Sequence, residues 1–435
     1  MADVESGVRG ESVAGSEAGS VAPTSLRGRL RVVGPGLVIA ATGVGAGDLV
    51  SSVVAGTRFG TAFIWAIIVG AIIKLCLVEG MGRWYMATGR TIMEGWHSLS
   101  RLASGFFVAY LLLVTFVFGA AVTSASALAV TAAFPGIMPL WAWAVLHAVV
   151  FGFILVGVGR YGLFERVIEF FVGLMFVTVV GLAILLLPDL PQSLAAGLVP
   201  TLPEGSLLYA LGLIGGVSGT FTLASYPYWV RERGWRGASW MPTMRLDSSV
   251  GYVVTAVFMI SMLIVGATLL FGTGRTISGE EGLLTLSDPL GDRFGLAARW
   301  LFLLGFWSAT TSSIVGAWNG SAYLFADYVR TVRRVPDERA QEYLSEKSPY
   351  FRGFLVWITF PPMVLLFFGQ PVFLVIIYAA LGALFLPFLA VTLLWLMNSS
   401  RVPREHRNRI VSNAGMVLAV LLFVVIGVQQ ITGLF

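Results

Sequence analysis

The chain has 435 residues, of which 57% are hydrophobic and 12% charged, and its mean hydropathy is +0.85. This composition excludes an ordinary soluble domain and indicates an integral membrane protein, and the helix-length apolar segments exclude an outer-membrane β-barrel. A single cysteine and three histidines exclude a disulfide framework and give no basis for an enzyme site built on histidine. The net charge of +5 does not indicate nucleic-acid binding, because the basic residues follow a membrane topology.

The first 29 residues are polar and rich in Gly, Ala and Ser. They lack the basic segment followed by an apolar segment that defines a signal peptide. We therefore predict that residues 1–29 form a disordered cytoplasmic tail.

Eleven apolar segments follow that are long enough to cross a bilayer, and we predict a transmembrane helix in each. With the N-terminus in the cytoplasm, 23 of the 28 Lys and Arg residues fall on the cytoplasmic side and four outside, while Lys74 lies within a span. This asymmetry predicts a multi-pass protein of the prokaryotic inner membrane with an external C-terminus. The predicted spans are 30–57, 61–87, 105–133, 138–158, 164–187, 207–233, 246–271, 296–327, 351–369, 371–397 and 410–432.

The first span is interrupted near its middle by three glycines at alternate positions, followed by Asp48. Glycine weakens a helix by about 1 kcal/mol relative to alanine. A carboxylate at membrane depth normally faces a partner or a wet cavity. The stretch therefore predicts a broken helix that forms a binding site, with a flexible kink and a structurally paired aspartate as the alternative. The predicted substrate-binding residues here are Thr42, Gly45, Ala46, Gly47 and Asp48, with Asp48 as the metal ligand.

The sixth span is also rich in glycine near its middle. Two interrupted spans at corresponding places in two halves are typical of secondary transporters built from inverted repeats. We predict an all-α, 5+5 inverted repeat with an eleventh helix: repeat 1 over 30–187, an external linker over 188–206, repeat 2 over 207–397, and a cytoplasmic loop with the last helix over 398–435. The predicted substrate-binding residues in span 6 are Ser218, Gly219, Thr220 and Phe221.

Other polar residues have a structural and a functional interpretation. Ser312 and Ser313 in span 8 are hypothesised to share a coupling cation with carbonyls of span 1, although hydroxyls also support helix packing. Asn319 is assigned to the same coupling-ion site. Glu79 and Arg83 are expected to pair on one helix face, and Asp247 and Asp327 are expected to pair with Arg245 and Arg330. The acidic loop 272–295 is interpreted as a surface lid.

Several short motifs recur at the ends and middles of the predicted spans. They are Gly34-Pro35, Ala55-Gly56, Phe59-Gly60, Ala87-Thr88-Gly89-Arg90, Gly197-Leu198-Val199-Pro200, Leu202-Pro203, Leu211-Gly212-Leu213-Ile214-Gly215, Ser312-Ser313-Ile314-Val315-Gly316, Leu386-Pro387-Phe388 and Ser399-Ser400-Arg401. In this order, over roughly residues 30–432, they resemble the Nramp family of divalent-metal transporters. The resemblance implies a LeuT-type inverted-repeat fold and a divalent metal as substrate.

This sequence departs from the family pattern at the positions that bind the metal. The family's Asp-Pro-Gly-Asn aligns with Gly45-Ala46-Gly47-Asp48, and its Met-Pro-His with Gly219-Thr220-Phe221. The acidic pair of span 3 aligns with Gly119 and Val122, and the glutamine of span 10 with Phe385. Losing the thioether removes the preference for soft metals, and the remaining oxygen ligands suit a hard cation such as Mg²⁺.

Three functions remain open at this point. The first is alternating-access transport of a hard or loosely selected divalent cation (Mg²⁺, Mn²⁺ or Fe²⁺), coupled to H⁺ or Na⁺. The second is cation-coupled symport of a small carboxylate or amino acid, and the third is a non-transporting sensor. No phosphate-binding loop motif is present, so ATP-driven transport is not indicated. We expect no enzymatic activity, no cofactor and no nucleic-acid partner, and the sequence leaves the oligomeric state open.

Overall fold

The structure is a computed structural model that describes residues 21–190, 193–273, 287–368 and 371–432. Within these ranges the regular elements are all helices. Among the described residues, six helices are long and apolar enough to cross a membrane, and a seventh span results if α2 and α3 are counted together. The acids Glu280 and Glu281 of the predicted lid lie outside the described residues, whereas Asp288 and Asp292 belong to α14 (Ser287–Phe294).

The helices of the first repeat coincide with the first five predicted spans. The second and third spans are the uninterrupted helices α4 and α6, and the fourth and fifth contain π-helical turns, at η1 and η2. The elements are α2 (Pro35–Gly43), α3 (Ala46–Phe59), α4 (Ile64–Thr88), α6 (Arg101–Ala133), α7 (Leu140–His147), η1 (Ala148–Leu155), α8 (Tyr161–Met175), η2 (Phe176–Val180) and α9 (Gly181–Leu186), with α5 (Ile92–Leu99) between α4 and α6.

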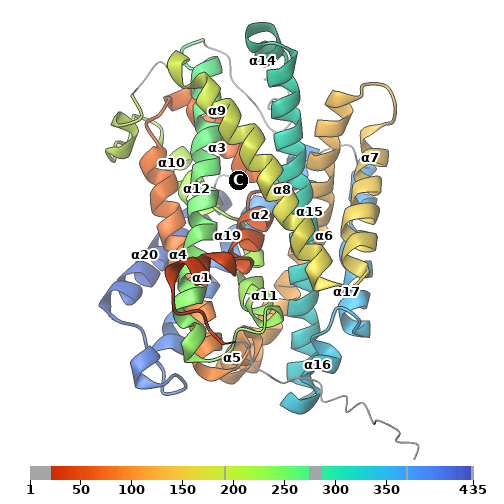
Figure 1. Ribbon diagram of the computed structural model, residues 1–435, viewed down its shortest axis with the longest axis vertical. Coiled ribbons are helices and arrows are strands. Elements are labelled where there is room, and N and C mark those ends of the chain that lie inside the picture. Colours follow the sequence, from red (N-terminus) through yellow and green to blue (C-terminus); the bar gives the residue numbers. More distant parts are fainter. Residues whose placement is uncertain (1–20, 191–192, 274–286, 369–370, 433–435) are drawn as a thin grey trace, which may run out of the picture.

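The second repeat and the last helix likewise coincide with spans six to eleven. Their elements are α10 (Leu207–Gly216), η5 (Phe221–Ser225), α11 (Tyr226–Glu232), α12 (Met241–Leu270), α15 (Leu296–Val332), α17 (Pro349–Thr359), α18 (Met363–Leu366), α19 (Pro371–Asn398) and α20 (Ile410–Thr432). Figure 1 shows α12 and α4 on one side of the molecule, α15 and α6 on the other, and the short helices α2 and α11 between them.

Both predicted breaks are present. The axes of α2 and α3 differ by 63° across the break at Val44 and Gly45. Helix α10 ends at Gly216, after which Ser218 and Gly219 adopt left-handed backbone conformations with φ of 60° and 70°. A non-glycine residue in this region is uncommon and marks local strain, which tertiary contacts must offset.

The two breaks lie against each other because glycine leaves room for backbone contact. A Cβ atom on Gly43 would lie 2.3 Å from Ser218 Oγ and 2.6 Å from the backbone of Ser218. On the other side of α2, a Cβ atom on Gly316 of α15 would lie 1.7 Å from Thr42 Oγ1. Only hydrogen fits at these positions, so the break in α2–α3 is held between α15 and the break after α10.

The predicted charge pairs are confirmed in two cases and wrong in one. Arg83 lies 3.1 Å from Glu79, and Arg330 lies 2.8 Å from Asp327. Asp247 does not pair with Arg245, which contacts Glu79 at 2.9 Å instead. Asp247 is fully buried and accepts hydrogen bonds from the Gly34 amide and the Tyr226 hydroxyl, at 2.9 and 2.8 Å. Arg245 is two residues from Asp247 in the sequence, and side chains at this spacing do not face each other on a helix.

The boundary predicted for the N-terminal tail is also corrected. Residues Leu26–Arg31 form a short helix, α1, which begins at a Ser25 cap that accepts a hydrogen bond from the Gly28 amide. The last residues of the segment 1–29 are therefore helical rather than disordered. Residues 1–20 of the predicted tail lie outside the described residues.

Candidate functional site

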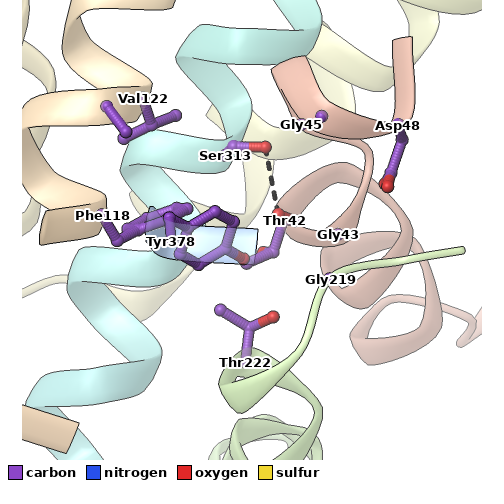
Figure 2. A pocket seen from close by; sticks show the side chains of 12 residues that line it. Thr42, Gly43, Gly45, Asp48, Phe118, Val122, Gly219, Thr222, Ser313 and Tyr378 are labelled. Atoms are coloured by element: carbon purple, nitrogen blue, oxygen red, sulfur yellow. Dashed lines mark hydrogen bonds between the residues drawn. The ribbon is translucent and has the colours of Figure 1, made fainter. Parts of the chain in front are cut away.

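A small cavity lies where the two broken helices meet. Its volume is about 50 Å³. Figure 2 shows the cavity between the α2–α3 break, the segment around Gly219, and side chains from α6 and α15. It is lined by Thr42, Gly43, Gly45, Gly47, Asp48, Phe118, Ala121, Val122, Gly219, Thr222, Ser313 and Tyr378.

Asp48 supplies the charge of this cavity. It lies in the first turn of α3, where a carboxylate is favoured by the helix dipole, and it is only 6% exposed. Its Oδ2 atom is buried and has no hydrogen-bond partner. Buried carboxylate oxygens are normally paired, so an unpaired one that faces a cavity marks a candidate binding position.

Hydroxyl groups add neutral oxygen atoms that could bind a cation around the same cavity. Thr222 Oγ1 is buried without a partner. The Thr42 hydroxyl donates to the Val38 carbonyl at 2.7 Å, which leaves its lone pairs free to face the cavity. The lining therefore offers one carboxylate and several neutral oxygens, and the described residues contain no cluster of three or more His, Cys, Asp or Glu.

The serines of α15 form hydrogen bonds with the carbonyl groups that the α2–α3 break leaves without helical partners. Ser313 Oγ is 3.0 Å from the Thr42 carbonyl oxygen and 3.1 Å from that of Val44, and Figure 2 shows the first of these contacts. Ser312 donates to the Ala41 carbonyl at 3.0 Å. One hydroxyl proton cannot satisfy several carbonyl groups, so this cluster retains unused acceptors.

Asp48, Thr42, Gly45, Gly47 and Gly219 of the predicted substrate site line the cavity, and so does the predicted coupling-ion residue Ser313. The other predicted residues of the second break lie behind the lining. Ser218 Oγ is 3.4 Å from the Ile39 carbonyl oxygen, Thr220 Oγ1 is 3.3 Å from the Tyr378 hydroxyl, and Phe221 packs edge-on against Phe118.

Ala46 begins α3, but its side chain lies outside the described residues. Gly119, Val122 and Phe385 are the residues predicted to stand where the family has its other polar side chains. Val122 lines the cavity, and Gly119 packs against the carbonyl of Ile358 in α17. Phe385 is fully buried and stacks on Tyr110 with ring centroids 5.5 Å apart.

Asn319 is not part of this cavity lining. Its Nδ2 donates to Glu346 at 2.8 Å, and its Oδ1 accepts from Trp229 Nε1 at 2.9 Å. Both the nitrogen and the oxygen of the Asn319 amide are thus engaged in a buried network that joins α15, α11 and the loop before α17. Burial raises the pKa of Glu346 in that loop to about 7, and the Asn319 hydrogen bond only partly opposes this.

The raised pKa of Glu346 therefore predicts that the stability of the fold depends on pH. Its carboxyl group holds a proton in the folded state between pH 4.5, its ordinary value, and about 7, so stability is highest below this window and falls as pH rises through it. We expect Glu346→Gln to remove a fall of about 3 kcal/mol across this range, measured as the pH dependence of the unfolding midpoint. Glu342→Gln, on exposed α16 (Ala340–Tyr343), is the control and should keep the wild-type slope.

The sequence placed Lys74 within a span but gave it no predicted part in the site. Lys74 of α4 is fully buried, and its ammonium group donates a hydrogen bond to the carbonyl oxygen of Gly219, a residue of the cavity lining. The signal was present, since a lone lysine near the middle of an apolar span is as exceptional as Asp48. Its neighbour could not be inferred, because Gly219 is 145 residues away in sequence.

A comparison with protein families decides the assignment. The model of the natural resistance-associated macrophage protein-like (Nramp) family matches residues 36–433. The chain belongs to the Nramp family. Solved structures agree: the manganese transporter of Eremococcus coleocola superposes with a TM-score of 0.77 at 16% identity, covering 96% of this chain and 91% of that one.

More distant structures share the same fold. Mhp1, a nucleobase-cation-symport-1 family transporter, matches with a TM-score of 0.60 at 15% identity over 92% of this Nramp chain and 93% of Mhp1. MhsT, solved with L-phenylalanine, matches with a TM-score of 0.55 at 15% identity, over 92% and 98% of the two chains. At these identities the likeness shows the fold alone, a LeuT-type inverted repeat with helices 1 and 6 broken.

One curated relative also matches. The uncharacterized membrane protein YcsG of Bacillus subtilis (strain 168) is 23% identical over 261 residues, which is 59% of this Nramp chain and 59% of YcsG. The match thus spans less than two-thirds of that protein's length.

Proposed function

We propose that this Nramp protein is a secondary active transporter that moves a small, hard divalent cation such as Mg²⁺ by alternating access. The observation that carries the proposal is the unpaired, buried Asp48 Oδ2 in a cavity between two broken helices. Charged groups at such positions in membrane proteins mark ion and substrate paths.

The donor set supports a hard ion over a soft one. The cavity lining contains carboxylate, hydroxyl and carbonyl oxygens, and it contains no thioether, thiol or imidazole. Oxygen ligands suit Mg²⁺ and, less selectively, Mn²⁺, whereas sulfur would favour softer metals. With one carboxylate, the ion would keep several of its water molecules, as Mg²⁺ does in many protein sites.

The cavity volume supports an ion over an organic solute. A water molecule needs about 10–15 Å³ of such volume, so about 50 Å³ holds an ion with a few waters. An amino acid or a carboxylate would require the broken helices to move apart. Symport of a small organic solute is therefore the second candidate, and a non-transporting sensor is the third.

Binding and flux together distinguish these functions. We would measure thermal stabilisation of the purified protein by divalent cations and by small organic acids and amines, because a ligand that binds only the folded state raises its stability. Uptake into proteoliposomes is measured for the stabilising ligand. Stabilisation and uptake of Mg²⁺ or Mn²⁺ support the proposal, an organic ligand alone overturns it, and binding without uptake indicates a sensor.

The coupling ion, H⁺ or Na⁺, is proposed to act at the serine cluster. The carbonyl groups of Thr42 and Val44, together with the Ser312 and Ser313 hydroxyls, form an oxygen-rich group suited to Na⁺. If Na⁺ binds here, Ser313→Ala should raise the Na⁺ concentration needed for half-maximal uptake by about tenfold, since it removes one ligand worth roughly 1.4 kcal/mol. Ser308→Ala, one turn away on α15, is the control because Ser308 donates to its own helix at Leu304. Uptake that needs a pH gradient and ignores Na⁺ would leave H⁺ as the coupling ion.

We also propose an inner-membrane location with the N-terminus in the cytoplasm and the C-terminus outside. The asymmetry of Lys and Arg supports this orientation.

A further inference from the structure

Lys74 differs from the other buried cations in the part of the chain that the structure describes. Arg83 and Arg330 are also buried, but each has a carboxylate partner, Glu79 at 3.1 Å and Asp327 at 2.8 Å. Lys74 has no carboxylate within 4.0 Å among the described residues. Its hydrogen bond goes to an uncharged acceptor, the Gly219 carbonyl oxygen. A buried ammonium group without a contacting anion is unfavourable, so its retention requires another explanation.

Asp48 and Lys74 act on each other across the helix break without touching. The two charges interact electrostatically, yet Asp48 Oδ2 has no hydrogen-bond partner. Gly219 links them, because its carbonyl oxygen accepts the hydrogen bond of Lys74 while the residue itself lines the cavity that Asp48 faces. The cavity thus has the Asp48 carboxyl group in its wall and the Lys74 ammonium group bonded to the other side of one of its lining residues.

We propose that Lys74 is a specificity-determining residue that sets how strongly the cavity discriminates between cations of different valence. This inference rests on the proposed cation site at Asp48. Lys74 acts through its charge and through Gly219, and it is not a ligand. A fixed positive charge opposes a bound cation in proportion to the charge of that cation, so its effect on a divalent ion is twice that on a monovalent ion in free energy. Lys74 thereby weakens the binding of Mg²⁺ and favours its release, which transport requires.

The valence dependence separates this role from a structural one. Lys74→Gln removes the charge but keeps an N–H donor for the Gly219 carbonyl, and Lys74→Met removes both. Lys74→Arg keeps the charge. A change in the shape of the break would alter the affinities for Mg²⁺ and for the similarly sized Li⁺ by similar factors. Loss of the charge instead changes the Mg²⁺ affinity by the square of the factor by which it changes the Li⁺ affinity.

The test is a titration of the purified full-length protein with MgCl₂ and with LiCl at constant ionic strength, for the wild type and each variant. For Lys74→Gln we expect affinity to rise about 10-fold for Li⁺ and about 100-fold for Mg²⁺. Lys74→Arg should keep the wild-type ratio of Mg²⁺ affinity to Li⁺ affinity. Lys74→Met repeats the measurement if Lys74→Gln does not fold.

Equal factors for the two ions, or no change in either, would overturn the role of Lys74 while leaving the cation site intact. Absence of any cation binding in both the wild type and Lys74→Gln would instead refute the proposed function. The two failures are therefore distinguishable.

Discussion

Asp48→Asn is expected to abolish cation binding and uptake, with a loss of at least about 100-fold in affinity. The substitution preserves the size of the side chain and removes the charge whose Oδ2 atom is buried without a partner. Inside a protein, attraction between a carboxylate and a divalent ion is far stronger than in water, so its removal exceeds about 3 kcal/mol. The measurement is the stabilisation of the purified variant by Mg²⁺ or Mn²⁺, followed by uptake into proteoliposomes.

The variant should fold, because Asp48 makes no contacting ion pair among the described residues and its uncharged form no longer bears the cost of burial. Its unfolding midpoint without ligand is expected to equal or exceed that of the wild type. Asp292→Asn on α14 is the matched control, since Asp292 is exposed and is not part of the cavity lining. Metal-dependent stabilisation that survives in Asp48→Asn would show that the cation binds elsewhere.

Gly43→Ala is expected to disrupt the contact between the two breaks and to remove transport. A Cβ atom there would lie 2.3 Å from Ser218 Oγ and 2.6 Å from the Ser218 backbone, so one of the two segments must shift. Ser218 already adopts a positive φ of 60° and cannot relax freely. Overpacking of this kind destabilises a protein by about 1–3 kcal/mol, and here it also displaces Thr42 and Gly219 from the cavity.

Gly212→Ala provides the control for the Gly43 substitution. Gly212 lies within α10, and a Cβ atom there meets no atom within 4 Å, so the added methyl group raises helix propensity without a clash. The two variants are compared by their unfolding midpoints and by uptake. Equal behaviour of the two would contradict the close packing of the breaks, since only Gly43 is confined.

The fold followed from sequence patterns that depend on local chemistry. Apolar length, the distribution of Lys and Arg, and the glycine-rich interruptions predicted the helices and their two breaks, because a membrane span must satisfy its own backbone and glycine fails to maintain a helix. The structure confirms both breaks and the all-helical, LeuT-type fold. These properties are local to a segment, so neighbouring residues in the sequence are sufficient to reveal them.

The members of the site were predicted only in part. Asp48, Thr42 and Ser313 line the cavity. The first two were predicted from the break in the first span, and Ser313 was predicted from the serine pair in span 8. Asn319 is instead engaged by Trp229 and Glu346, and Asp247 is engaged by Gly34 and Tyr226. For these side chains the direction around the helix axis decided the partner, and span boundaries known to a few residues do not fix that direction.

The sequence by itself determined that this is a multi-helix membrane protein with a charged break in its first span, because hydropathy and glycine content act within one segment. Only the tertiary structure decided that Lys74 lies behind the wall of the Asp48 cavity. That arrangement joins α4 to a residue 145 positions later, through a left-handed glycine at the second break. Such a contact arises from how the helices pack, and no local pattern encodes it.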